Sequence, residues 1–314
     1  MTEAPSAVAS LPVERVVRDV SQVLKGKDDV VRLCLIGILA RGHILLEDVP
    51  GVGKTTLARA LARILGGTFA RVQMTADLLP ADIVGGPVLD KKQGELVFRP
   101  GPIFSNVVLA DELNRATPRT QSGLLEAMAE RSVSVDGKSH PLPSPFFVLA
   151  TQNPSDHHGA YRLPQSQLDR FLLRTHLGYP DADTEMAMLM AADAPPTEEV
   201  LQPLLQQAQL AELHAAVDRV RVSTEVAAYL HQVVEATRAS GDFEIGVSTR
   251  GMLAFARAAR ARALVEGRTY VVPDDVYEMA VPACAHRVVV SGDGERETAE
   301  GLLRACLEQV EPPS

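Results

Sequence analysis

The chain has 314 residues, of which 46% are hydrophobic and 23% are charged, and its net charge at pH 7 is −9. This composition is typical of globular proteins with a substantial core, and it excludes an intrinsically disordered chain. The acidic balance also argues against nucleic-acid binding, which usually needs a basic face, so we expect no nucleic-acid partner.

Two further features concern location in the cell. No apolar stretch reaches the ~18 residues of a membrane span, and the first residues, MTEAPSAVASLPVERV, lack the apolar core of a secretory signal. The three cysteines, Cys34, Cys284 and Cys306, stand in separate apolar contexts without a CxxC pair, which indicates buried thiols in a reducing compartment. We therefore expect a cytoplasmic protein without direct membrane insertion.

The first predicted elements are two helices, over residues 11–24 and about 28–40, because apolar residues recur there at helical spacing. Gly26 separates them. Nucleotide-binding domains often place an adenine against a segment in this position, so Val23, Leu24 and Gly26 are candidates to line the base. The pattern is equally consistent with a place for these residues in the core.

The segment ILLEDVPGVGKTT, residues 44–56, predicts a strand, a glycine loop and a helix. The backbone N–H groups of such a loop surround an anion, and the start of the following helix adds positive potential. Lys54 is expected to reach the terminal phosphates, and the Thr55 hydroxyl to ligate Mg²⁺. Asp48 stands where the pattern has glycine, which leaves an ordinary strand–turn–helix corner as the alternative. The candidate nucleotide-binding residues are Asp48, Val49, Pro50, Gly51, Val52, Gly53, Lys54, Thr55 and Thr56.

Two later strands are expected to end in residues that act on a nucleotide. Residues 107–110 form an apolar run without alternation, which is typical of a strand buried on both faces of a parallel sheet. Asp111, at its carboxyl end, is placed to hold Mg²⁺, and Glu112 to deprotonate an attacking water. A second buried strand, residues 146–150, is followed by Asn153, whose side chain would face the γ-phosphate.

Glycine, proline and alternating residues define the remaining organisation. Residues 83–100 and 131–147 read as two β-hairpins, although the first is also compatible with a surface loop. From residue 181, after Pro180, the composition shifts to helical segments rich in alanine and glutamine. We predict an α/β fold: a P-loop parallel-sheet domain over residues 1–179 with β-hairpin insertions, followed by a smaller all-helical domain over residues 180–314.

With these motifs in this order, the chain resembles the AAA+ ATPases, and more narrowly the MoxR family. The resemblance is carried by LLEDVPGVGKT, LADELNRATPRTQSGLLEAMAERSV, ATQNP, LPQSQLDRF and STRGMLAFARAARARALVEGR, which together cover most of residues 44–268. It implies that Asp111 and Glu112 are the Walker B pair, that Asn153 is sensor 1, and that the helical domain is a lid. One departure is Thr249, where the family often has proline.

The resemblance also assigns two arginines to the chemistry. Arg170, in LDRF, matches the arginine finger, which acts on the ATP of the next chain in a ring; Arg250, in STR, matches sensor 2, which we expect to act on the ATP of its own chain. Each would neutralise charge on the γ-phosphate oxygens. An arginine in a surface ion pair is the alternative for each, and Arg115 and Arg131 are rival fingers.

The resemblance implies a Mg²⁺-dependent ATPase that binds ATP and Mg²⁺ and forms a homo-oligomeric ring, expected to be a hexamer. It would act as a chaperone-like remodeller that matures a partner protein with a von Willebrand A domain, or a metalloenzyme. Two other classes stay open on the sequence alone: a nucleic-acid-associated motor or loader, and a nucleotide-gated scaffold that hardly turns ATP over.

Overall fold

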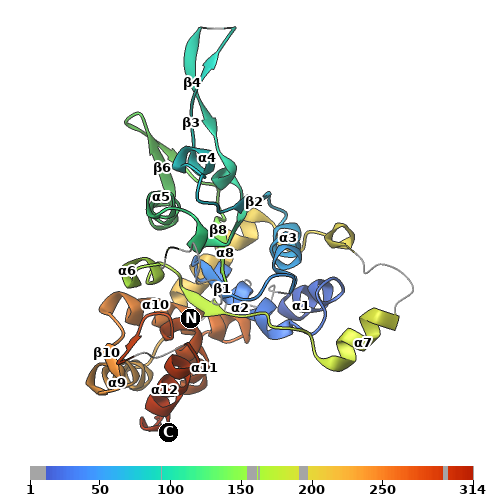
Figure 1. Ribbon diagram of the computed structural model, residues 1–314. Coiled ribbons are helices and arrows are strands. Elements are labelled where there is room, and N and C mark those ends of the chain that lie inside the picture. The colour runs from blue at the N-terminus through green and yellow to red at the C-terminus, as the bar shows by residue number, and fades with distance from the viewer. Residues whose placement is uncertain are drawn as a thin grey trace, which may run out of the picture.

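The computed structural model describes residues 12–92, 94–153, 161, 163–190, 197–292 and 296–313. Its first part is a parallel sheet flanked by helices, and its second part is mainly helical (Figure 1). The helices of the first part are α1 (Val13–Ser21), α2 (Asp28–Leu39), α3 (Lys54–Ile64), α4 (Pro80–Val84), α5 (Pro118–Glu130) and α6 (Gln165–Leu168), with the short 3-10 helices η2 (Pro102–Phe104) and η3 (Leu113–Arg115).

Five parallel strands form the central sheet in the order β2-β5-β8-β1-β9. They are β1 (Ile44–Glu47), β2 (Phe69–Gln73), β5 (Val107–Asp111), β8 (Phe147–Gln152) and β9 (Leu173–Thr175). Every residue of β1 and β5 is buried, as expected for strands covered on both faces. Gln73 is paired with Asp111, and Glu47 with Gln152, so the strands end together at one edge of the sheet. The predicted parallel-sheet fold is confirmed.

Both predicted hairpins are present as insertions that project from the sheet (Figure 1). One pairs β3 (Gly85–Asp90) with β4 (Glu95–Pro100), and the other pairs β6 (Ser132–Val135) with β7 (Lys138–Pro141). Asp136 and Gly137 both have positive φ, 50° and 74°, which is the backbone that a two-residue hairpin turn requires. The Phe98 ring stacks on His140 with centroids 3.9 Å apart, so the two hairpins contact each other.

The lid is helical, as predicted, and contains one addition. Its helices are α8 (Gln207–Arg219), α9 (Thr224–Ala239), α10 (Thr249–Val265), α11 (Pro273–Cys284) and α12 (Arg296–Glu308). The addition is a ribbon of β10 (Phe243–Ile245) paired antiparallel with β11 (Val289–Val290). Strands of this length are too short for residue alternation to reveal them, because alternation needs at least four residues.

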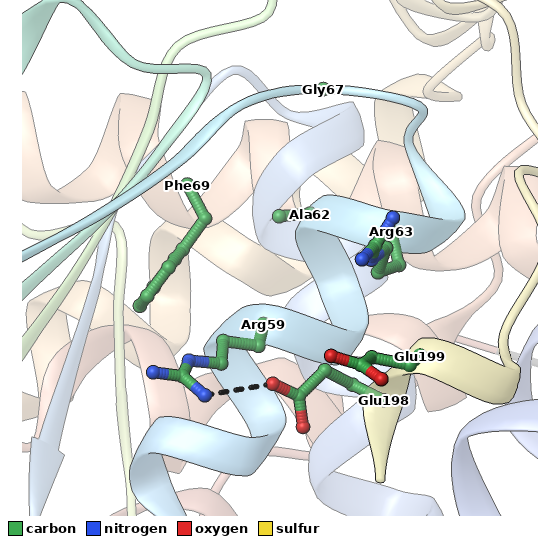
Figure 2. Close-up of a pocket in the computed structure, with 7 residues that line it drawn as sticks. All are labelled: Arg59, Ala62, Arg63, Gly67, Phe69, Glu198 and Glu199. Atoms are coloured by element: carbon green, nitrogen blue, oxygen red, sulfur yellow. Dashed lines mark hydrogen bonds and ion pairs between the residues drawn. The ribbon is translucent and has the colours of Figure 1, made fainter.

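The chain does not pass directly from the sheet into the lid. After β9 it forms α7 (Ala182–Met190) and the 3-10 helix η4 (Glu198–Val200), and then returns along α3. The N–H groups of Leu204 and Leu205 donate to Ile64 O at 2.9 and 3.0 Å. Arg59 pairs with Glu198 at 2.9 Å in a pocket of about 330 Å³ between these segments (Figure 2). The boundary at residues 179 and 180 therefore stays a prediction, since part of the later chain packs on the first domain.

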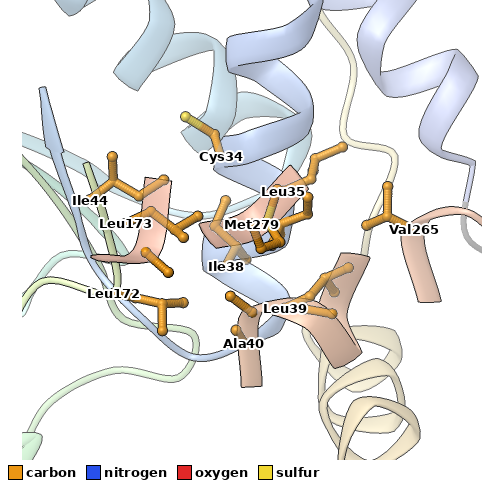
Figure 3. Close-up of a cluster of buried hydrophobic side chains, with 14 of the residues drawn as sticks. Cys34, Leu35, Ile38, Leu39, Ala40, Ile44, Leu172, Leu173, Val265 and Met279 are labelled. Atoms are coloured by element: carbon orange, nitrogen blue, oxygen red, sulfur yellow. The ribbon is translucent and has the colours of Figure 1, made fainter. Parts of the chain in front are cut away.

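Helix α2 joins the sheet to the lid through one continuous hydrophobic core. Figure 3 shows Ile38 and Leu39 of α2 among Leu173 of the sheet and Met279 of the lid. His214, on α8, contacts Ile38 O at 3.0 Å, which adds a buried polar link. All three cysteines are buried, and burial raises the pKa of Cys34 and of Cys284 to about 12, so these thiols stay protonated. Among the described residues, no helix is both long and apolar enough to cross a bilayer.

Candidate functional site

The glycine loop between β1 and α3 has the backbone of an anion-binding loop. Gly51 and Gly53 have φ values of 88° and 102°, which side-chain-bearing residues rarely adopt. A Cβ on Gly53 would also lie 2.8 Å from the Leu24 side chain, so glycine is required there on two grounds. The ammonium of Lys54, the first residue of α3, donates to the carbonyls of Asp48 at 3.1 Å and Val49 at 3.2 Å. The loop thus places backbone N–H groups and a cation at the start of an 11-residue helix.

The side chain of Asp48 does not face this loop. It is buried, and its carboxylate accepts the N–H of Leu177, and that of Gly178 at 3.2 Å, from the segment after β9. A carboxylate directed at phosphates would repel them, and here it is turned to backbone donors instead. The nucleotide contact predicted for Asp48 stays a prediction, and with the carboxylate engaged in this way it would be made by the main chain of Asp48.

The acidic pair lies at the end of β5, next to the loop. Asp111 accepts the Thr151 hydroxyl at 2.7 Å on one carboxylate oxygen and pairs with Arg71 at 2.6 Å on the other. Glu112 has φ 59°, an uncommon backbone for a non-glycine residue that often marks functional sites. Its carboxylate accepts the side-chain amide of Gln73 at 2.7 Å. The left-handed backbone at Glu112 turns the two carboxylates in different directions. Asp111 contacts Thr151 of β8 and Arg71 of β2, whereas Glu112 contacts Gln73 at the end of β2.

These groups meet in a cleft of about 230 Å³ at the carboxyl edge of the sheet. The residues that line it are Pro50, Gly51, Gly53, Lys54, Thr55, Arg71, Gln73, Asp111, Glu112 and Asn153. The hydroxyl of Thr55 and the carboxylate of Asp111 are hard oxygen donors, the ligand type that Mg²⁺ prefers, so the donor set fits that ion. The convergence brings together predicted residues from three separate segments of the chain.

Other predicted residues lie outside this lining. Val52 packs into the core, and Val49 packs against it. Thr56 follows Thr55 in the first turn of α3 and is half-buried. A Cβ on Gly26 would meet Asp181 and Thr184 at 3.5 and 3.6 Å, so Gly26 faces the start of α7. Its contact with an adenine stays a prediction.

Arg71 and Gln73 are site residues that the sequence did not reveal. Both belong to β2, and they reach the acidic pair only because β2 lies beside β5 in the sheet. The polar end of the 69–74 segment is the one signal in the sequence, and it does not say which strand is the neighbour. Thr151, which holds both acids through its hydroxyl, is hidden for the same reason.

Arg170 lies at the opposite end of the parallel strands from the cleft. We call the end at which the strands begin the amino edge, and the end at which they finish the carboxyl edge. It precedes β9, whose Leu173 pairs in parallel with Ile44, whereas the glycine loop follows β1. A strand of this length separates the two positions by about 10 Å, at ~3.3 Å per residue. Arg170 is exposed, and its guanidinium donates to Leu125 O at 2.7 Å. It therefore points to solvent on the amino edge, away from the cleft of its own chain.

Arg250 lies at the amino edge too. Ser248, the N-cap of α10, accepts the Gly251 N–H at 2.9 Å and contacts Asp169 at 3.5 Å, one residue before Arg170. In Figure 1, α10 lies beside α6 and away from α3. The contact of Ser248 with Asp169 places the start of α10 beside the segment that carries Arg170, and the expectation that Arg250 acts on the ATP of its own chain stays a prediction. Thr249, in place of the family's proline, is the first residue of α10 and leaves the helix start intact.

The rival arginines divide between the two edges. Arg115 pairs with Glu112 at 3.3 Å, so it lies beside the cleft of its own chain. Arg131 follows α5 and donates to Arg41 O at the amino edge. Burial, with the charges of Arg41 and Arg257, lowers the pKa of Arg131. Arg131 is an exposed member of the amino edge, as Arg170 is.

A buried arginine joins the lid to this amino edge. Arg287 is 3% exposed, and it donates to the Asp169 carboxylate at 2.7 Å, to Phe171 O at 2.6 Å and to Leu172 O at 3.1 Å. A Cβ on Gly251 would fall 2.7 Å from the Arg287 side chain. Arg287 therefore sits between the segment of Arg170 and the segment of Arg250, and nothing in the sequence singles it out.

Comparisons with known proteins agree with this geometry. The family described as "ATPase family associated with various cellular activities (AAA)" matches residues 43–173, and the "AAA lid domain" matches residues 235–305. The chain is 43% identical over 301 residues to the uncharacterized protein YeaC of Bacillus subtilis, covering 95% of this chain and 94% of that protein. It is 40% identical over 312 residues to the chaperone MoxR1 of Mycobacterium tuberculosis, covering 96% and 82%. A crystal structure of a candidate ATPase from Cytophaga hutchinsonii matches with a TM-score of 0.88 at 33% identity, covering 98% of this chain and 96% of that one.

Proposed function

The chain belongs to the MoxR family of AAA+ ATPases, and on that premise we propose that it hydrolyses ATP with Mg²⁺, in a ring of identical subunits, to remodel a partner protein. The observation that carries the proposal is the convergence of Lys54, Asp111 and Glu112 on one cleft of about 230 Å³. A phosphate-binding loop alone would serve a binding protein, whereas an added general base serves hydrolysis.

Each residue of the cleft has a role in this reaction. The loop N–H groups and Lys54 bind the phosphates, and Glu112 takes the proton of the attacking water. Asn153, at the adjacent strand end, orients the γ-phosphate by hydrogen bonding. Mg²⁺, held by Thr55 and Asp111, supplies positive charge that neutralises the phosphate oxygens.

We infer the ring from the separation of the cleft and the two exposed arginines between the two edges of the sheet. The cleft lies at the carboxyl edge, while the exposed Arg170 and Arg250 lie at the amino edge. Neither arginine is among the residues that line the cleft of its own chain, and we propose that a neighbour's amino edge completes the site. Such head-to-tail contacts close into a ring, and we propose a hexamer. Both arginines then act in trans, which revises the role that the sequence suggested for Arg250.

The client is the least constrained part of the proposal. MoxR1 is named a chaperone, and we propose the same class of activity here, in the cytoplasm, on a protein with a von Willebrand A domain or a metalloenzyme. The first hairpin supports contact with a protein, because Leu89 and Leu96 on it are 57% and 69% exposed. Affinity capture with Glu112→Gln, which would hold ATP and its client, identifies the partner.

The direct test is phosphate release from ATP with and without Mg²⁺. Wild-type protein should turn ATP over only with Mg²⁺, and Lys54→Ala should lose both turnover and binding of a fluorescent ATP analogue while its circular dichroism stays unchanged. Unaltered affinity in Lys54→Ala would contradict the site. For the ring, sedimentation with a slowly hydrolysed analogue should show a larger species, and a monomer under every condition would exclude this assembly.

A further inference from the structure

Asp48 connects the glycine loop to the segment that leads into the lid. Its carbonyl accepts the Lys54 ammonium at 3.1 Å. Its carboxylate accepts the N–H groups of Leu177 and Gly178, the latter at 3.2 Å. One buried residue thus binds the phosphate-directed lysine through its main chain and the exit segment, residues 177–181, through its side chain.

The exit segment has further attachments close by. The buried Lys27 ammonium donates to Tyr179 O at 2.7 Å. Asp181 caps the start of α7 by accepting the Thr184 N–H at 2.8 Å, and those hydrogen bonds lower its pKa. Gly26, with φ 69°, lies against this cap. The exit segment is therefore hydrogen-bonded to Lys27 as well as to Asp48, and of these two residues Asp48 is the one that belongs to the glycine loop.

The general P-loop pattern has glycine at this position, and glycine could make neither side-chain bond. We propose that Asp48 is a positioning residue that couples nucleotide binding to the exit segment. The inference rests on the proposed ATP binding. A phosphate bound by the N–H groups of the loop would fix the main chain at Asp48, and a fixed main chain limits the positions from which the Asp48 carboxylate can accept the N–H groups of Leu177 and Gly178.

The proposal and the general pattern make opposite predictions for Asp48→Gly. The pattern predicts equal or better nucleotide binding, because the substitution completes it. If Asp48 couples the loop to the exit segment, Asp48→Gly should bind nucleotide more weakly than wild type, by about fivefold to 150-fold, the usual range of coupling between sites. Because coupling is reciprocal, nucleotide should also slow hydrogen exchange of the Leu177 and Gly178 amides in the wild-type protein by the same factor.

The experiment therefore measures two quantities on the full chain. A fluorescent ATP analogue is titrated into wild type, Asp48→Gly, Asp48→Asn and Asp82→Asn, and hydrogen exchange at residues 177–178 is followed with and without the analogue. In Asp48→Gly, exchange there should be fast in both states. Asp82→Asn is the matched control, because Asp82 also accepts a backbone N–H, from Leu79 at 2.9 Å, far from the loop, and it should behave as wild type.

Two outcomes would overturn the proposal: equal affinity in Asp48→Gly, or wild-type exchange at residues 177–178 that does not respond to bound analogue. The second needs no variant, so it decides the matter even if Asp48→Gly does not fold. Asp48→Asn keeps the shape but points an N–H₂ at one of two donors, and an intermediate loss is expected. If wild type binds no analogue at all, the proposed ATP site fails instead, which is a distinct result.

Discussion

The two edges of the central sheet carry different chemical groups. At the carboxyl edge, Lys54, Asp111 and Glu112 line an open cleft suited to a phosphate, a metal and a water. At the amino edge, Arg170 and Arg250 are exposed cations. Parallel strands enforce this division, because all loops that follow strands gather at one edge and all segments that precede them gather at the other. The molecule is therefore asymmetric in the sense that head-to-tail assembly requires.

Within the amino edge, burial decides what an arginine does. Arg170 is exposed and donates to Leu125 O, whereas Arg287 is enclosed by Asp169 and several carbonyls. Burial lowers the pKa of Arg287, and the charge of Asp169 opposes that shift. A guanidinium surrounded in this way stabilises its own chain and cannot extend to another, while Arg170 has few local partners to give up.

The largest effect is expected from the exposed arginines. Arg170→Ala and Arg250→Ala should each lower kcat for ATP, by up to ~10³–10⁵-fold for a finger in trans. Each variant mixed with Lys54→Ala should regain activity, because Lys54→Ala subunits still present both arginines to a neighbour. Phosphate release from the mixtures measures this.

A matched control for that experiment uses two defects on the same edge. Glu112→Gln mixed with Lys54→Ala should regain nothing, since every cleft in the mixed ring lacks one of its own groups. If the Arg250→Ala mixture alone stays inactive, Arg250 acts within its own chain and the division between the edges does not hold.

Removal of the base should be the next largest effect. Glu112→Gln should bind ATP as wild type does but lower kcat by ~10²–10⁴-fold, because Gln keeps the shape and the contact with Gln73 but cannot accept a proton. Single-turnover kinetics separate this from binding. Turnover at the wild-type rate would remove Glu112 from the carboxyl-edge chemistry.

The third prediction compares how much Arg287 and Arg170 contribute to the free energy of unfolding. Arg287→Met should lower the free energy of unfolding by about 3–5 kcal/mol, since it removes the buried guanidinium that pairs with the half-buried Asp169 and donates to the buried carbonyls of Phe171 and Leu172. Arg170→Ala should change it by no more than about 0.5 kcal/mol, as for other exposed positions. Urea unfolding of both variants gives the comparison. Equal stabilities would show that burial does not separate their roles.

The smallest effect is a pH dependence of the lid joint. His286 contacts Phe171 O at 2.9 Å, and burial, with the charges of Arg287 and Arg174, holds its pKa well below the ordinary value. The unfolded chain takes up a proton below its pKa of about 6.5, so stability is full above that pH and falls as pH drops, by at most about 1.4 kcal/mol per unit for this residue. Urea unfolding at several pH values checks this.

The matched variant for the pH test is His286→Gln, which keeps an N–H for Phe171 O but does not titrate. Its stability should fall less steeply with pH than that of wild type. His43, whose pKa burial lowers to about 4, contributes equally to both proteins and cancels in the comparison. Parallel curves would mean that the lid joint does not respond to pH through His286.

Local chemistry made much of the fold and the cleft predictable from sequence. The glycine loop, the buried strands before Asp111 and Asn153, and the turn at Asp136 and Gly137 depend on residues close together in the chain. Backbone conformation and burial on both faces leave their signals within a few residues, so these elements follow from composition and spacing. Their convergence follows as well, since parallel strands end at a common edge.

Only the tertiary structure decided which distant segments meet. Strand order placed Arg71 and Gln73 beside the acids, and the packing of the lid put Ser248, at the start of α10, beside Asp169. The buried Arg287 and the contacts of the Asp48 carboxylate arise in the same way. These contacts join residues more than 30 positions apart, and side-chain chemistry names a possible partner but not the one that folding brings near.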